Sequence, residues 1–356
     1  MSKSQTKRWG KAPRHTNCDR PFHSAGNCPS VKPSTFSENS YGFRANRSAH
    51  DAIRKAKGYI KEGYRWVIDM DLEKFFDKVN HDKLMGIFAK KRVEDRILLK
   101  LIRKSLQSGV MLNGVGQSTE EGTPQGGPLS PLLSNIILDK LDEELEVRGH
   151  KFVRYADDCN IYVKSLKAGE RVMESITTFI EQKLKLRVNR DKSAVDRPWK
   201  RKFLGFSFTW NKETKVRIAK QNIKRFKTKI REITSRSRPI PLEIRIEMLN
   251  RYLTGWCGYS ALDDTPSKFK EFDDWIRRRF RMCEWKQWKM SKTRVRKLIS
   301  LGVPDYKANE WGNSRKKYWR IACSPSPILH KTLDNSYWSK RGLRSLYNRY
   351  EILRQS

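Results

Sequence analysis

The sequence predicts an α+β fold: an antiparallel sheet with helices on one face, followed by a helical region. The segments that begin at Trp66 and Phe152 are rich in β-branched and aromatic residues, as strands are. Apolar residues recur at helical spacing in four segments: 48–63, 80–107, 130–147 and 168–186. After Trp210 the composition shifts to basic segments of helical period, so we expect a second, helical domain there.

The charge of the chain points to a polyanionic partner. Its 356 residues allow two or three domains of about 100–200 residues each. With 76 Lys and Arg against 39 Asp and Glu, the net charge is +37. Each cation that meets a phosphate releases counterions, so this excess favours nucleic acid. Ribosomal and histone-like proteins are equally basic, but they rarely carry 11 Trp or acidic strand ends.

Targeting signals are missing from the sequence. No apolar run reaches about 18 residues, so we expect no transmembrane helix and no membrane partner. The N-terminus lacks the apolar segment of a signal peptide. The six Cys follow no disulfide framework, which indicates a reducing, intracellular setting.

Residues 1–36 are polar, contain Pro, Gly and Ser throughout, and show no period, so we expect a mostly irregular arm. The arm contains His15, Cys18, His23 and Cys28, whose types and spacing resemble a zinc knuckle. Chance spacing in an irregular arm is the favoured alternative, because residue type and spacing alone often mislead.

Adjacent carboxylates interrupt the strand-like segment at Asp157 and Asp158. At the tip of a hairpin both can converge on one oxygen-rich pocket, the kind that Mg²⁺ takes when it also holds a phosphate. A site with two metal ions about 3.5–4 Å apart needs a further carboxylate from another strand. Asp71, at the end of the Trp66 strand, is the preferred candidate. Asp69 shares its face and is the second choice, whereas Asp77 is expected to cap the next helix.

Further elements follow in order. A hairpin is expected over 110–119, around Asn113-Gly114. Gly126 and Gly127 would let the backbone approach a ligand closely. Residues 215–238 hold ten Lys or Arg and one Glu around a helical apolar stripe. A second stripe, which includes Phe272 and Phe280, carries Arg on its outer positions, and such faces can follow a nucleic-acid backbone.

Six sequence blocks together resemble one family. They are Ser37–Arg44, the Asp71 block, Gly122–Pro131, Tyr155–Asp158, Arg187–Ser193 and Phe203–Phe206. Tyr155-Ala156-Asp157-Asp158 resembles the catalytic box of reverse transcriptases, and Asn250–Tyr259 resembles the block that marks the maturase-specific domain. From about Ser37 to the C-terminus the chain is similar to group II intron-encoded reverse transcriptase/maturases of the endonuclease-lacking type.

The resemblance implies a right-hand polymerase fold. Fingers and palm would span 37–210, the thumb or maturase-specific (X) domain 215–300, and a basic, Trp-rich extension 301–356. The α+β palm would carry partial fingers, because the region before Ser37 is shortened or atypical against the family.

The resemblance also implies site residues. Asp71, Asp157 and Asp158 would be catalytic and would bind two Mg²⁺, with Mn²⁺ as an alternative. Nucleotide and template would contact Arg44, Gln125, Gly126, Lys192 and one bulky aromatic ring. Of the two candidate rings we prefer Phe75, and Phe76 would then pack in the core. Leu204 and Gly205 would grip the primer. The thumb would contact RNA through Lys224, Arg225, Lys227, Lys229, Arg277, Arg278, Arg279 and Arg281.

The expected function is that of an RNA-directed DNA polymerase that also acts as a maturase, binding and folding its intron RNA for splicing and mobility. Its partners would be group II intron RNA, an RNA template with a DNA primer, a DNA target and deoxynucleoside triphosphates. A ribonucleoprotein particle in the bacterial cytoplasm is the expected setting. The alternatives are a polymerase-inactive RNA-binding remnant and, less favoured, a domesticated reverse transcriptase with a host role.

Overall fold

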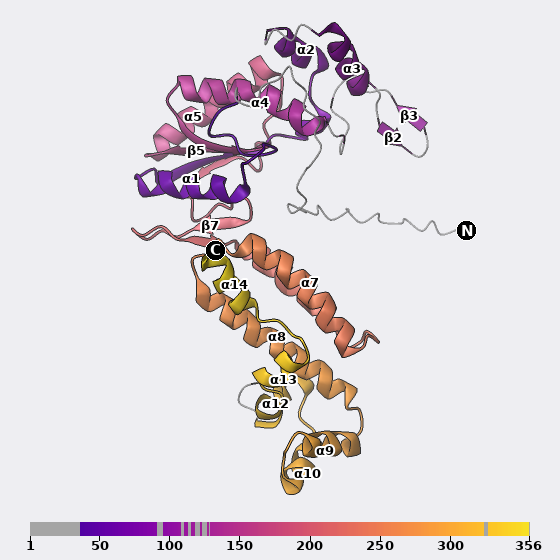
Figure 1. The fold of residues 1–356 in the computed structure, drawn as a ribbon. Coiled ribbons are helices and arrows are strands. Elements are labelled where there is room, and N and C mark those ends of the chain that lie inside the picture. The colour runs from indigo at the N-terminus through magenta and orange to yellow at the C-terminus, as the bar shows by residue number, and fades with distance from the viewer. Residues whose placement is uncertain are drawn as a thin grey trace, which may run out of the picture.

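A computed structural model describes residues 36–90, 95–107, 110–112, 115–117, 122, 127, 129–323 and 327–355. The chain forms an α/β part and an elongated helical part, joined near the small hairpin that contains β7 (Figure 1). The predicted α+β fold with a helical second half is confirmed.

The α/β part is built on a four-stranded sheet of order β4-β5-β1-β6, whose neighbours are all antiparallel. Its strands are β1 (Trp66–Met70), β4 (Lys151–Tyr155), β5 (Asp158–Val163) and β6 (Ala194–Asp196). Its helices are α1 (Ala49–Lys61), α2 (His81–Lys90), α3 (Arg96–Gln107), α4 (Ser130–Val147) and α5 (Leu166–Phe179), with short turns at Phe75–Asp77 and Ile180–Leu184. The predicted hairpin is present as β2 (Val110–Leu112) and β3 (Val115–Gln117).

Alternating side chains of the sheet enter two apolar clusters. Ile68, Phe152 and Ile161 pack with α4 and α5, so helices cover this face of the sheet as predicted. Val67 and Tyr162 point to the opposite face and pack with α1. The sheet is therefore covered on both faces, and the α1 side leads into the core of the helical part.

The helical character expected over 80–107 is confirmed, but the structure divides it into two helices, α2 and α3. The Asp95 carboxylate accepts hydrogen bonds from the backbone N–H groups of Ile97 (2.9 Å) and Leu98 (3.0 Å). A side chain that satisfies these otherwise unpaired donors marks a helix start. The apolar period runs on in sequence, but Asp95 begins a new helix.

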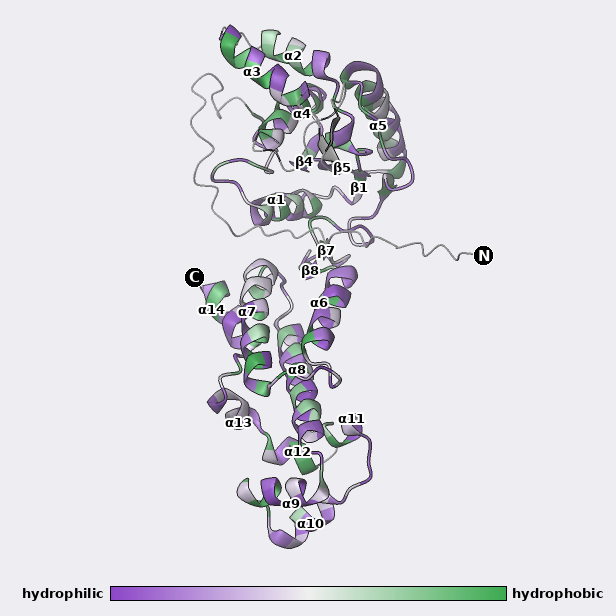
Figure 2. Cartoon of the chain, turned by 90° about the vertical axis from the view of Figure 1, so that its right-hand side faces the viewer, coloured by the Kyte–Doolittle hydropathy of each residue, from purple (hydrophilic) through white to green (hydrophobic). Residues whose placement is uncertain are grey.

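The helical part starts after a hairpin of β7 (Phe206–Phe208) and β8 (Val216–Ile218). Its longer helices are α6 (Lys220–Ile233), α7 (Leu242–Ser260), α8 (Pro266–Gln287), α9 (Ser291–Ser300) and α14 (Leu346–Gln355). The shorter ones are α10 (Asp305–Gly312), α11 (Tyr318–Ile321), α12 (Pro327–Thr332) and α13 (Asn335–Lys340). Figure 2 shows hydrophilic residues along much of α6.

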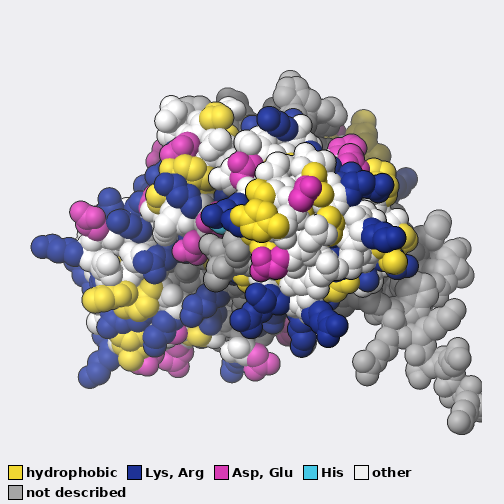
Figure 3. Space-filling model, turned by 90° about the horizontal axis from the view of Figure 1, so that it is seen from below, with side chains coloured by type: hydrophobic (Ala, Val, Ile, Leu, Met, Phe, Trp, Pro, Cys, Tyr) yellow, Lys and Arg dark blue, Asp and Glu magenta, His cyan; other side chains and the backbone are white. Residues whose placement is uncertain are grey.

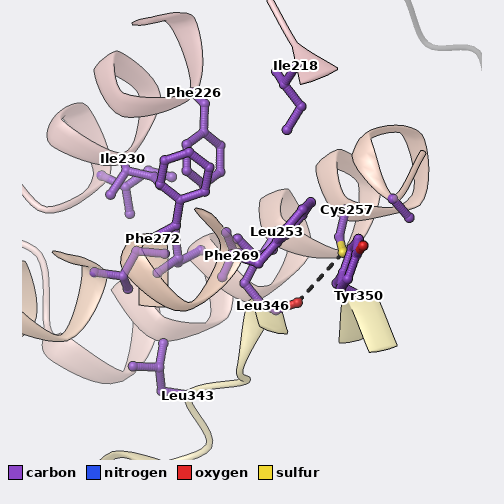
Figure 4. Packing of buried hydrophobic residues seen from close by; sticks show 14 of the residues in the cluster. Ile218, Phe226, Ile230, Leu253, Cys257, Phe269, Phe272, Leu343, Leu346 and Tyr350 are labelled. Carbon is purple, nitrogen blue, oxygen red and sulfur yellow. Dashed lines mark hydrogen bonds between the residues drawn. The ribbon is translucent and has the colours of Figure 1, made fainter. Parts of the chain in front are cut away.

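Aromatic packing holds the helical part together (Figure 4). Phe226 of α6 stacks on Trp256 of α7 with ring centroids 3.9 Å apart, and Phe269 of α8 stacks on Tyr350 of α14 at 4.2 Å. The Cys257 thiol donates to the carbonyl oxygen of Leu346. The C-terminal helix α14 thus returns along α7 and α8 to the junction with the α/β part (Figure 1).

Within the described ranges, none of the helices combines the length and the apolar character needed to cross a membrane.

Candidate functional site

Strand register brings three predicted carboxylates to one edge of the sheet. β1 pairs with β5 from Trp66–Val163 to Met70–Cys159, so Asp71, the next residue, comes beside Asp158. Tyr155 pairs with Asp158 across the β4–β5 hairpin, which leaves Ala156 and Asp157 as its two-residue turn. Carboxylates distant in sequence therefore share one site.

The charges at this edge repel one another. Desolvation by the surrounding protein raises the pKa of Asp158, and together with the negative charges of Asp157, Asp69 and Asp71 it brings the pKa to about 7. Asp158 nevertheless remains exposed to solvent. A site that accumulates negative charge and stays open on one side is suited to a cation from solution.

Each of the two β1 carboxylates forms an ion pair with a different cation. The Lys192 Nζ lies 3.2 Å from an Asp71 carboxylate oxygen. Arg201 approaches Asp69 to 2.6 Å and neutralises it from behind the sheet edge. The Lys192 side chain is 69% exposed, so it can move away from Asp71 when a phosphate or a metal ion arrives. This arrangement favours Asp71 over Asp69 as the available carboxylate.

The strand end that carries Asp71 is fixed by the segment that follows α5. The Asp71 backbone N–H donates to the Ser193 hydroxyl (3.0 Å), and its carbonyl accepts from the Asn189 N–H (2.8 Å). The residue next to Asp71 also bridges to Val188. The Arg187–Ser193 block thus positions the Asp71 carboxylate and supplies Lys192.

The donors at this edge fit a hard divalent cation in kind, because all of them are carboxylate oxygens. A bound divalent cation would reduce the repulsion between these negative charges. Among the described residues, however, no group of three His, Cys, Asp or Glu side chains is close enough to hold an ion as arranged here. Metal binding would have to draw Asp71, Asp157 and Asp158 together.

The structure reverses the choice between the two Phe rings. Phe75 is 3% exposed and belongs to the core cluster beneath the sheet, whereas Phe76 is half-buried. The rings meet edge to face, with centroids 5.2 Å apart. A ring buried in the core cannot meet a nucleotide, so Phe76 is the candidate and Phe75 is its support.

Leu204 and Gly205 form a tight turn, as both have positive φ values of 49° and 82°. Phe203 and Phe206 close it with two backbone hydrogen bonds, at 2.8 and 2.9 Å. The φ of Gly205 is one that residues with a Cβ rarely adopt, so the turn favours glycine there. The two residues assigned to the primer grip thus lie at a rigid loop tip.

Arg44 has partners of its own. Its guanidinium donates to the carbonyl oxygens of Ser37 and Ser40 and lies over the Phe36 ring. These bonds fold the Ser37–Arg44 block upon itself.

Six residues of the predicted sites lie outside the part of the chain that the structure describes. They are Gln125 and Gly126, and the zinc-knuckle residues His15, Cys18, His23 and Cys28.

The thumb cations separate into exposed and engaged groups. Lys224, Arg225 and Lys229 are exposed on α6, and Lys229 also pairs with Glu232 (3.1 Å). Lys227, half-buried, lies over the rings of Phe272 and Trp275. Seen from the end of the helical part, Lys and Arg are spread over the surface with Asp and Glu between them (Figure 3).

One of the four α8 arginines, Arg281, is buried, which argues against its assignment to RNA contact. Arg281 is 4% exposed and donates to the Leu333 carbonyl oxygen (2.9 Å), and burial lowers its pKa to about 10. Arg279 donates to the Thr234 hydroxyl and to carbonyl oxygens at the end of α6. Arg277 pairs with Asp274, and Arg278 lies over Trp319. Arg277, Arg278 and Arg279 are all half-buried.

Sequence patterns missed the support beneath the carboxylate hairpin. Arg154 precedes Tyr155 in an apolar strand and is fully buried against Asp142. A lone charge at an inward strand position is a signal for a buried ion pair.

Comparison with known proteins identifies the family of the chain. Residues 27–208 match the family described as reverse transcriptase (RNA-dependent DNA polymerase). The chain belongs to the reverse transcriptase family. This match begins ten residues before Ser37, so the similarity to the family extends further toward the N-terminus than the six sequence blocks indicated. Residues 223–300 match the maturase-specific domain of group II introns, as expected of an intron-encoded reverse transcriptase/maturase.

Curated relatives share parts of the chain. Protein YkfC of Escherichia coli is 34% identical over 200 residues, which are 46% of this chain and 52% of YkfC. Group II intron-encoded protein LtrA of Lactococcus lactis is 28% identical over 230 residues, 47% of this chain and 38% of LtrA. The chain thus spans about half or less of these two relatives. A solved telomerase from Candida tropicalis aligns with 89% of this chain and 57% of its own, at 12% identity and a TM-score of 0.41.

Proposed function

We propose that this reverse transcriptase-family chain is an RNA-directed DNA polymerase whose site is formed by Asp71, Asp157 and Asp158. The observation that carries the proposal is the register of β1, β4 and β5, which places these three carboxylates at one sheet edge. Desolvation and the neighbouring negative charges raise the pKa of Asp158 to about 7, which is typical of a site that needs a cation.

The site would bind Mg²⁺, or Mn²⁺ in its place. Asp71 and Asp157 would hold two ions, with Asp158 sharing or shaping the site. Bound there, divalent ions lower the pKa of a primer 3′-hydroxyl and stabilise the charge on the leaving pyrophosphate. Lys192, now 3.2 Å from Asp71, would turn to the phosphates of the incoming nucleotide. Phe76 would close the sugar side of the pocket and exclude a 2′-hydroxyl by its bulk.

The primer and the RNA would rest on the helical part. The Leu204–Gly205 turn presents a rigid backbone that would hold the primer end. The exposed α6 cations Lys224, Arg225 and Lys229, with Arg277 and Arg278 of α8, would lie against an RNA backbone. The match to the maturase-specific domain supports group II intron RNA as the structured partner. We place the boundary between the polymerase domain and the maturase-specific domain in the 210–215 segment. We also propose a DNA target as a partner.

Primer extension tests the polymerase. The purified chain is given a DNA primer on an RNA template with Mg²⁺ and deoxynucleoside triphosphates. Extension by the wild type and its loss in the Asp157→Asn/Asp158→Asn variant would support the proposal. Both proteins should fold alike by circular dichroism, because the carboxylates lie at the sheet edge rather than in the core.

A second function is favoured by one observation: the carboxylates are not grouped closely enough to hold an ion as arranged here. A polymerase-inactive RNA-binding maturase would account for this spacing. It predicts no extension by the wild type, together with tight, salt-sensitive binding of group II intron RNA. Extension that depends on Asp157 and Asp158 would exclude it.

A further inference from the structure

A buried arginine lies directly behind the carboxylate hairpin. Arg154 is 0% exposed, and each of its five guanidinium N–H groups has an acceptor. Nε and Nη2 donate to the two Asp142 carboxylate oxygens at 2.8 and 2.6 Å. The remaining N–H groups donate to the Ser40 hydroxyl (2.8 Å), the Asn135 side-chain oxygen (3.1 Å) and the Ala156 carbonyl oxygen (2.9 Å).

The last of these bonds reaches the turn itself. Ala156 has a φ of 55°, in the left-handed region that residues with a Cβ seldom adopt. Such a conformation persists only when the surroundings hold it. The Arg154 Nη1 holds the Ala156 carbonyl from below, and Asp157 and Asp158 follow directly in the chain.

A second contact clamps the turn from the side. The Tyr41 N–H donates to the Arg154 carbonyl (2.8 Å), and the Arg154 N–H donates to the Asn39 carbonyl (2.9 Å). A Cβ on Gly42 would come within 2.2 Å of the Ala156 nitrogen, so this segment presses against the turn. Asn135 joins both supports, since its amide also donates to the Gly42 carbonyl (2.9 Å).

We propose that Arg154 is a positioning residue, which sets the direction of the Asp157 and Asp158 carboxylates by fixing the Ala156 carbonyl. The inference rests on the proposed polymerase function. Lysine at this position could keep the charge pair with Asp142, but its single nitrogen cannot serve Asp142, Ser40, Asn135 and Ala156 together. The turn would then relax and the carboxylates would lose their alignment.

The test compares three variants of the full chain with the wild type. Arg154→Lys keeps the buried charge. Arg154→Met/Asp142→Leu replaces the ion pair by apolar groups of similar size, a change that buried pairs often tolerate. Arg245→Lys is the matched control, because Arg245 is 3% exposed and donates to four backbone carbonyls of the helical part, away from the sheet edge.

Two quantities are measured: kcat and KM for single-nucleotide addition, and Mn²⁺ affinity without nucleotide, by calorimetry. For both Arg154 variants we expect kcat to fall roughly a hundredfold with KM little changed. We expect Mn²⁺ affinity to fall about tenfold or more, as it does when groups that orient metal ligands are lost. Arg245→Lys should lower the melting temperature but leave kcat and Mn²⁺ affinity near the wild-type values.

Wild-type kcat and Mn²⁺ affinity in both Arg154 variants would overturn the inference. Equal losses in the Arg245 control would also overturn it, because they would show a general effect of destabilisation. If the wild type does not polymerise, the proposed function fails, and the Mn²⁺ titration alone still decides whether Arg154 positions the carboxylates.

Discussion

The Tyr259 hydroxyl donates a hydrogen bond to the Leu204 carbonyl oxygen at 2.6 Å, and this bond joins the end of α7 to the turn assigned to the primer. Asn222 of α6 binds the neighbouring Gly205 carbonyl (3.1 Å). His50 of α1 contacts the Tyr259 carbonyl at 2.7 Å. Helices of the thumb and of the palm thus meet at one loop of the chain.

Removing that hydroxyl should loosen the primer without stopping the chemistry. Tyr259→Phe keeps the ring contact with Phe206 but loses the bond to Leu204. We expect the free energy of unfolding to fall by about 1 kcal/mol. The number of nucleotides added per binding event should fall several-fold, while the rate of the first addition stays the same. Tyr252→Phe is the control, since its hydroxyl makes no hydrogen bond in the part of the chain described. An unchanged product length for Tyr259→Phe would contradict this role.

The two adjacent Phe rings should respond differently to truncation. Phe75→Ala removes a core ring and should lower the free energy of unfolding by about 3–5 kcal/mol. Phe76→Ala should cost less stability, but reduce the preference for deoxynucleotides over ribonucleotides at least about tenfold. The measurement is kcat/KM for matched nucleotide pairs, with urea unfolding alongside. Altered sugar preference in Phe75→Ala alone would restore the original assignment.

Exposed cations on α6 should set the salt dependence of RNA binding. Lys224→Ala/Arg225→Ala removes two surface charges and should reduce the slope of log K against log salt by roughly 1–2. Arg281→Met is the contrasting variant: it should lower stability and leave the slope unchanged, because Arg281 lies inside the domain. A filter-binding series with group II intron RNA between low and physiological salt measures both. The assignment is wrong if the Arg281 variant shows the larger change in slope.

A pH-dependent contact joins the palm to the thumb at Asp264. It pairs with Lys57 of α1 (2.7 Å) and Arg354 of α14 (3.0 Å) and accepts the Val216 N–H (2.9 Å). Burial acts to raise the pKa of Asp264, but the bonds from Lys57 and Val216 and the two positive charges outweigh it, so the pKa lies below its usual value.

A carboxylate with a lowered pKa stabilises the folded state above its unfolded pKa of about 3.9, and the contribution disappears as pH falls through the folded value. Asp264→Asn should therefore be less stable than the wild type near pH 7, and the difference should shrink below about pH 4. Asp305→Asn removes an equal charge from an exposed helix start and serves as control. Melting curves at several pH values measure the stability difference between the wild type and Asp264→Asn. A difference that grows toward low pH would contradict the prediction.

The sequence predicted most of the sheet because β-strand alternation and the Asp-containing blocks are local signals. Strand period places Ile68 and Met70 on one face, and the adjacent carboxylates mark a hairpin turn. Helix ends were harder, since the cap at Asp95 competes with an unbroken apolar period. Local patterns identify elements well, but they identify element boundaries less reliably.

Local sequence patterns could not predict whether a given side chain points into the core or toward the surface. Phe75 and Phe76 are chemically identical, and only packing on the core decides which ring is buried. Arg281 resembles the other arginines of α8 in sequence, yet it is buried and donates to the Leu333 carbonyl of a distant segment. The role of Arg154 depends on Asp142, Asn135 and Ser40, which converge only in the folded chain.

In the proposed site, Asp71 rather than Asp69 is the β1 carboxylate that joins Asp157 and Asp158. The most direct test is the rate of single-nucleotide addition to a DNA primer on an RNA template, for Asp71→Asn beside Asp69→Asn. We predict that Asp71→Asn loses on the order of 10³-fold or more in rate. Asp69→Asn, whose carboxylate is already held by Arg201, should keep most of the activity. Comparable activity in the two variants, or a greater loss in Asp69→Asn, would contradict the proposed site.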